Sequence, residues 1–172
     1  MKKSNIVLIG MSGAGKSTVG MALSYKLKMP FVDMDNYIER KEKMTIAQLF
    51  EKLGNDGFRD LESKVAEHIG TNYKRTIIST GGGVVLRSEN MENLKKNGIV
   101  VYINRSVENI LKTLNAEKRP LLKENPEKLY EMYKERHELY LKYADVCVSN
   151  SEDFKSGVEN VYYAIKDKID ER

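Results

Sequence analysis

The sequence has a single cysteine, Cys147, and no long uninterrupted apolar run. One cysteine excludes an intramolecular disulfide and fits a reducing compartment, so we expect a cytoplasmic protein. A membrane-spanning helix needs roughly 18 or more consecutive apolar residues, so none is expected. The short apolar run after the basic N-terminus lacks the length and the cleavage site of a signal peptide.

Basic stripes interleaved with aromatic residues, which would indicate nucleic-acid binding, are also missing. The net charge of +4 is mild and the basic residues are scattered, so we expect a solvated Lys/Glu surface and no nucleic-acid partner. Repeats, linkers and low-complexity tracts are absent. The 172 residues therefore predict one domain over 1–172, which we expect to be a monomer.

Short apolar runs alternate with helical segments along the chain. The first run, 6–9, is apolar on both faces, which is typical of a strand buried in a parallel sheet. Strands are predicted at 6–9, 31–33, 76–79, 99–103 and 146–148. Helices are predicted at 16–28, 45–53, 56–69, 88–96, 106–114, 125–142 and 154–169. Five strands alternating with helices predict a three-layer α/β domain with a five-stranded parallel sheet.

Several residues mark the ends of these elements. Thr45 opens a capping box and Gly54 is expected to end the helix that follows. Ser88 and Ser106 are predicted to be N-caps. Cys147 lies in the apolar run of the last strand, where we expect it to be buried. The stretch 115–125 has weak periodicity and is predicted to be a lid loop over a site.

The segment Gly10-Met11-Ser12-Gly13-Ala14-Gly15-Lys16-Ser17 matches the Walker A pattern in full. A buried strand precedes it and a helix follows, as the pattern requires. Its glycines let backbone N–H groups surround phosphate oxygens, and the helix N-terminus adds partial positive charge. Lys16 is placed to reach the β- and γ-phosphates, and Ser17 to bind Mg²⁺. The segment predicts an ATP-dependent phosphotransferase.

Two carboxylates, Asp33 and Asp35, follow the second predicted strand. Ligands in such sheets bind at the carboxyl ends of the strands, so both carboxylates can face the phosphate loop. One could hold Mg²⁺ or its waters, and the other could orient an acceptor hydroxyl and take its proton. The alternative is that Asp35 only caps the next helix.

Further motifs suggest an acceptor pocket, although each alone is weak. Arg59 and Glu62 are i, i+3 neighbours on a predicted helix, so Glu62 can orient Arg59, but exposed pairs of this kind are usually incidental. Gly81-Gly82-Gly83 follows a buried strand, which favours a close backbone approach to a ligand. Arg119 in the predicted lid can stabilise charge on the transferring phosphate. Arg136 on a later helix can bind a carboxylate or lie on the surface.

Taken in order, these motifs resemble shikimate kinase over nearly the whole chain. The motifs that carry the resemblance are the Walker A segment, Asp33-x-Asp35, Phe58-Arg59-x-x-Glu62, Gly81-Gly82-Gly83, Arg119-Pro120-Leu121-Leu122 and Arg136-x-x-x-Tyr140. The resemblance implies a nucleoside-monophosphate-kinase-like P-loop fold with strand order 2-3-1-4-5. It also implies the Mg²⁺-dependent reaction ATP + shikimate → shikimate 3-phosphate + ADP, a step toward chorismate and the aromatic amino acids.

By position, the resemblance implies a role for each motif residue. Arg59 and Arg136 would bind the shikimate carboxylate, and Asp35 would hold ring hydroxyls and act as the base. Ser17 and Asp33 would hold Mg²⁺, and residues 34–69 would form the substrate-binding region. Shikimate would bind to Asp35, Arg59, Gly81, Gly82, Gly83 and Arg136, with Phe50 and Phe58 beside the ring. ATP would bind to Gly13, Ala14, Gly15, Lys16, Ser17, Thr18, Lys112 and Arg119, with Lys16, Asp35 and Arg119 catalytic.

The chain departs from the family pattern on the adenine side. Lys112 stands where many relatives have an arginine that stacks on adenine, and lysine stacks less well. The segment 149–153 lacks the basic and proline residues common there. Two alternatives stay open: another small-molecule kinase of this fold, such as a gluconate or nucleoside monophosphate kinase, or a nucleotide-binding regulatory module without turnover.

Overall fold

The computed structural model describes residues 2–114, 125–151 and 153–169. Its five strands form one parallel sheet in the order β2-β3-β1-β4-β5, which confirms the predicted sheet and strand order. The strands are β1 (Asn5–Ile9), β2 (Phe31–Asp33), β3 (Ile77–Ser79), β4 (Gly98–Asn104) and β5 (Val146–Ser149). β1 is buried along its whole length, because strands pair with it on both sides and helices cover both faces.

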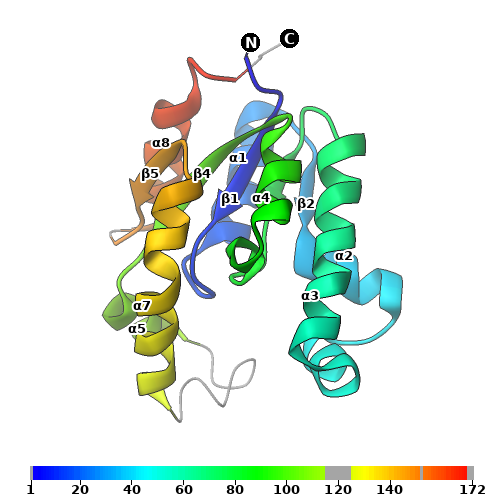
Figure 1. Ribbon diagram of the computed structural model, residues 1–172. Coiled ribbons are helices and arrows are strands. Elements are labelled where there is room, and N and C mark those ends of the chain that lie inside the picture. Colours follow the sequence, from blue (N-terminus) through cyan, green and yellow to red (C-terminus); the bar gives the residue numbers. More distant parts are fainter. Residues whose placement is uncertain (1, 115–124, 152, 170–172) are drawn as a thin grey trace.

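Helices cover both faces of this sheet and complete the three layers (Figure 1). α1 and α8 pack together on one face, and α3, α4 and α7 lie on the other. The helices are α1 (Lys16–Leu27), α2 (Met34–Glu42), α3 (Ile46–Asn72), α4 (Ser88–Lys95), α5 (Val107–Thr113), α7 (Pro126–Tyr143) and α8 (Phe154–Ile165), with a short 3-10 helix η1 (Val84–Leu86). In Figure 1 the strands run downward, so their carboxyl ends lie between the lower parts of α3 and α7.

The two helices predicted around Gly54 form one kinked element, α3. Thr45 caps it through the predicted capping box: its hydroxyl accepts from the Gln48 N–H, and the Gln48 side chain accepts from the Thr45 N–H. Gly54 is non-helical, with φ 69° and ψ −179°, which confirms the break. The helix resumes directly, so the kink redirects the chain and sends the second half of α3 along the sheet.

Three sequence-based expectations about element ends or burial are wrong. Cys147 is exposed, because β5 is an edge strand on which only Val148 is buried. Ser88 lies inside α4, whose N-cap position makes no side-chain cap bond. α8 ends at Ile165 and not at 169, because the chain turns there, and Ile169 then forms an isolated parallel bridge with Lys3, just before β1.

The alternative in which Asp35 only caps the next helix is excluded. Asp33 caps α2 by accepting from the Asn36 N–H at 3.0 Å.

The lid predicted at 115–125, with Arg119, lies outside the described residues except for its last position. Within the ranges that the structure describes, no helix is both long and apolar enough to span a bilayer.

Candidate active site

The phosphate loop joins β1 to α1 at the carboxyl edge of the sheet. Gly15 is the N-cap of α1 and has φ 94°, a left-handed backbone conformation that glycine adopts at little cost. A cleft of about 200 Å³ opens here, and Ala14 is buried behind it. The cleft is lined by Ser12, Gly13, Gly15, Lys16, Ser17, Thr18, Asp33, Asp35, Thr80 and Gly82. The predicted ATP-binding loop and the predicted acceptor carboxylate therefore share one cleft.

Lys16 is held inside the loop, with 7% of its surface exposed. Its Nζ donates to the carbonyl oxygens of Gly10 and Met11, each at 2.8 Å. A buried ammonium needs such acceptors, and the bonds keep the charge at the phosphate-binding end of the cleft.

Ser17 and Asp33 meet across the cleft although they come from different elements. Ser17 Oγ donates to Asp33 Oδ2 and lies 3.1 Å from Ser79 Oγ. Hydroxyl and carboxylate oxygens are ligands that Mg²⁺ prefers, usually together with waters and substrate phosphates, so the pair fits the ion. In the described part of the chain no group of three or more His, Cys, Asp or Glu residues could hold a metal.

The triple glycine after β3 is the point on which the acceptor-side residues converge. A Cβ at Gly81 would lie 2.9 Å from Asp35 Oδ1, and a Cβ at Gly82 would lie 3.5 Å from Arg136 Nη1. A Cβ at Gly83 would overlap the Arg59 guanidinium. Side chains at Gly81 and Gly83 would displace the Asp35 carboxylate and the Arg59 guanidinium, which explains these two glycines better than a bare turn does, while a Cβ at Gly82 would make an ordinary contact with Arg136.

Arg59 is fixed by Glu62, as the i, i+3 spacing predicts. Arg59 Nη1 donates to Glu62 Oε1 at 2.6 Å, and Glu62 is 1% exposed. Burial raises the pKa of the Glu62 carboxyl above its ordinary value, and the Arg59 charge opposes this shift. The guanidinium also lies 5.6 and 5.3 Å from the ring centroids of Phe50 and Phe58, which stack on each other. The pair is therefore a buried element of the site and not a surface ion pair.

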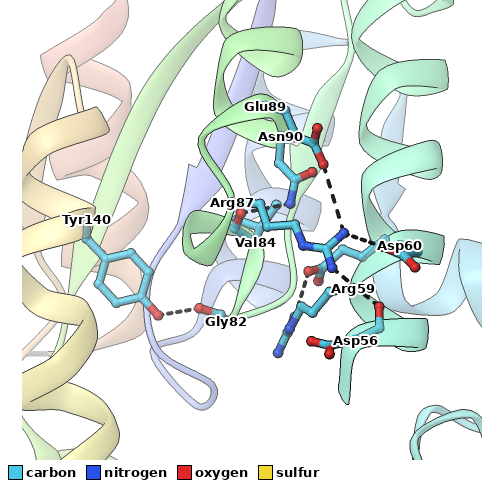
Figure 2. Close-up of polar contacts among 10 residues, drawn as sticks. Asp56, Arg59, Asp60, Gly82, Val84, Arg87, Glu89, Asn90 and Tyr140 are labelled. Carbon is cyan, nitrogen blue, oxygen red and sulfur yellow. Dashed lines mark hydrogen bonds and ion pairs between the residues drawn. The ribbon is translucent and has the colours of Figure 1, made fainter. Parts of the chain in front are cut away.

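Arg136 approaches from α7, on the opposite side of the glycine loop. One turn further along the helix, the Tyr140 hydroxyl donates to the Gly82 carbonyl at 2.5 Å (Figure 2). Tyr140 is fully buried and stacks on Tyr102 of β4. The Arg136 Nε is buried and has no hydrogen-bond partner among the described residues. The structure thus presents an arginine with unused donor capacity beside the cleft.

Two predicted ATP-side residues do not join this arrangement. Lys112 is exposed in the last turn of α5 and does not line the cleft, and Arg119 lies outside the described residues. Sequence reasoning also missed two supporting residues, Arg105 and Asn150, and it gave Tyr140 no role beyond its place in the Arg136-x-x-x-Tyr140 motif. The contacts of Arg105 and Asn150 with the nucleotide loop depend on tertiary packing, and no local sequence signal marks them.

The fold and the site together define a P-loop kinase for a small acceptor. A cradle for phosphates, a hydroxyl–carboxylate pair suited to Mg²⁺, and a neighbouring pocket with one carboxylate and two arginines suit phosphoryl transfer to an anionic alcohol.

Comparison with known proteins identifies the family. The family model described as shikimate kinase matches residues 12–169. A shikimate kinase of Clostridium botulinum is 43% identical and is aligned over 92% of this chain and 95% of the relative. One from Clostridium beijerinckii is 43% identical over 98% of each. The chain belongs to the shikimate kinase family, which makes it an ATP-dependent kinase of the kind that the motifs predicted.

Solved structures agree with this assignment. A shikimate kinase from Acinetobacter baumannii, in complex with shikimate, superposes with a TM-score of 0.87 at 37% identity, over 98% of this chain and 96% of that one. A gluconokinase from Sinorhizobium meliloti has a TM-score of 0.55 at 14% identity. The second likeness shows the shared fold alone.

Proposed function

We propose that this chain transfers the γ-phosphate of ATP to the 3-hydroxyl of shikimate, with the roles divided between two neighbouring loops. The nucleotide loop binds ATP and the triple-glycine loop gathers the groups that bind shikimate. The observation that carries this proposal is the convergence of Asp35, Arg59 and Arg136 on Gly81–Gly83 at the edge of the nucleotide cleft.

On the nucleotide side, Lys16 neutralises charge on the β- and γ-phosphates, and backbone N–H groups of the loop bind phosphate oxygens. Ser17 and Asp33 hold Mg²⁺, as their contact supports. The ion, when bound, draws charge from the phosphate oxygens as the transferred group leaves ADP. Arg119 is proposed to close over the phosphates from a lid at 115–125, and Lys112 to lie on the adenine side.

On the acceptor side, Arg59 and Arg136 bind the shikimate carboxylate, because two planar guanidinium groups suit a carboxylate better than lysines would. The hydrogen bond from Arg59 to Glu62 fixes the first of them. Asp35 orients the ring hydroxyls and accepts the proton of the attacking one. Residues 34–69 form the substrate-binding region of a single domain, and its closure with the lid would exclude water that otherwise hydrolyses ATP.

We infer that the enzyme is active as a monomer. The exposed single thiol of Cys147 and the use of ATP favour the cytoplasm.

The role of Asp35 is tested with Asp35→Asn, which keeps the size and a hydrogen-bond acceptor but removes the base. We expect kcat to fall by about 10²–10⁴-fold. Mg²⁺-dependent binding of ADP, measured by titration calorimetry, should stay unchanged. A variant with wild-type kcat would contradict the base role. A variant that no longer binds ADP would mean that Asp35 belongs to the nucleotide side.

A further inference from the structure

The carbonyl side of the nucleotide loop is held by two side chains from the far half of the chain. Arg105 Nη1 donates to the Gly13 carbonyl at 3.2 Å. Asn150 Nδ2 donates to the Ala14 carbonyl at 2.8 Å. The carbonyl and the N–H of one peptide group point in opposite directions, so holding the Ala14 carbonyl outward orients the Gly15 N–H toward the cleft. The Ala14 N–H, which follows the Gly13 carbonyl, donates to the Met11 carbonyl at 3.0 Å, so Arg105 holds this turn of the loop in place.

Asn150 sits in a slot that fixes its side-chain amide. Its backbone N–H donates to the Asn104 carbonyl at 2.9 Å, which continues the pairing of β4 with β5. A Cβ at Gly15 would lie 2.6 Å from Asn150 Nδ2, and a Cβ at Gly157 of α8 would overlap Oδ1. The residue is only 9% exposed. Two glycines thus make room for one amide, which argues against an incidental surface contact.

Arg105 adds charge as well as a hydrogen bond. It follows directly after β4 and is half-buried beside Gly13. Within the described ranges it forms no ion pair, and its buried Nε has no hydrogen-bond partner. A guanidinium that no carboxylate neutralises raises the electrostatic potential at the loop where phosphates bind.

We propose that Arg105 and Asn150 are positioning residues for ATP. Asn150 sets the orientation of the loop at Ala14 and Gly15, and Arg105 sets it at Gly13 while adding positive charge. This inference rests on the proposed binding of ATP at the loop. If so, residues directly after β4 and β5 contribute to nucleotide affinity. The segments that follow these two strands are the ones that depart from the family pattern on the adenine side, at Lys112 and at 149–153.

The test uses Asn150→Asp and Arg105→Met in the full-length enzyme. Asn150→Asp keeps the shape but replaces the donor by an anionic acceptor that faces the Ala14 carbonyl. The matched control is Asn97→Asp, because Asn97 Nδ2 makes the same kind of bond, to the Gly70 carbonyl at 3.0 Å, away from the cleft. The measurements are KM for each substrate, and Kd for ADP by titration calorimetry.

We expect Asn150→Asp to raise KM for ATP and Kd for ADP by about tenfold or more, and Arg105→Met by about three- to tenfold. KM for shikimate should stay within about twofold of the wild-type value in both variants. In the control Asn97→Asp, KM for both substrates should stay within about twofold of wild type. If Asn150→Asp does not fold, Arg105→Met carries the test alone, since its side chain is only half-buried.

Unchanged KM for ATP and Kd for ADP in the folded variants would overturn the inference. An equal rise in KM for ATP and for shikimate would also overturn it, because that pattern indicates general loosening of the site. Failure of the proposed function is a different result: the wild-type enzyme would then release ADP independently of shikimate.

Discussion

Replacing Arg136 by alanine removes one of the two guanidinium groups that converge on the triple-glycine loop. Arg136 Nη1 lies 3.5 Å from the position that a Cβ at Gly82 would occupy, and its Nε is buried without a partner among the described residues. In the proposed complex, alanine would leave the shikimate carboxylate without this guanidinium. We therefore expect weaker shikimate binding, with little effect on ATP.

The magnitude follows from the burial and from the second arginine. Truncating one member of a buried charge pair costs about 2–5 kcal/mol. Arg59, held by Glu62 at 2.6 Å, stays to bind the carboxylate, so we expect the lower half of this range. A loss of about 2–3 kcal/mol corresponds to a rise of roughly 30- to 150-fold in Kd for shikimate. The Kd of Arg136→Lys for shikimate should lie between those of wild type and Arg136→Ala, because lysine keeps the charge but lacks the planar guanidinium.

The assay is direct titration of shikimate, accompanied by KM for both substrates. Arg75→Ala is the matched control, since Arg75 is exposed on the connection from α3 to β3, at the opposite edge of the sheet. Wild-type affinity for shikimate in Arg136→Ala would contradict the proposed role of Arg136. A parallel loss of ATP affinity would show that Arg136 supports the nucleotide side instead.

Two further predictions concern groups buried beside the site. Burial raises the pKa of Tyr140 to about 12, so its hydroxyl stays protonated at neutral pH and keeps donating to the Gly82 carbonyl. Tyr140→Phe should raise KM for shikimate by about three- to tenfold without changing KM for ATP, and equal changes in both would contradict this. The Glu62 carboxyl has a folded-state pKa raised above 4.5 by burial, so its contribution to stability is present at low pH and is lost as pH rises through that pKa. The stability of Glu62→Gln relative to wild type should therefore increase as pH rises above the ordinary carboxyl pKa in denaturant titrations, and a relative decrease would contradict the raised pKa.

The sequence predicted the sheet and the nucleotide loop well, because both depend on local patterns. The apolar run of β1, the glycine spacing and Lys16 follow each other directly along the chain. Gly54 was correctly predicted to break its helix, since its φ of 69° is a local property. The order of the strands came from the family resemblance, not from the pattern of apolar residues.

Burial and long-range support were harder to predict. Cys147 lies in an apolar run that looks like a buried strand, but β5 is an edge strand, and strand position in the sheet is a tertiary property. Asn150 and Arg105 reach the nucleotide loop from more than 90 residues away, and the sequence contains no spacing that links them to it. Glu62 was correctly placed beside Arg59, but its near-complete burial depends on how α3 packs over the glycine loop.

We propose that the convergence of Asp35, Arg59 and Arg136 selects shikimate as the acceptor. The most direct test is the rate of ADP release by the wild-type enzyme with ATP and Mg²⁺, measured without acceptor and with shikimate, gluconate or AMP. We expect that shikimate alone strongly accelerates release, and that shikimate 3-phosphate accumulates in equal amount to ADP. Faster release with gluconate or AMP than with shikimate, or release that does not depend on an acceptor, would contradict it.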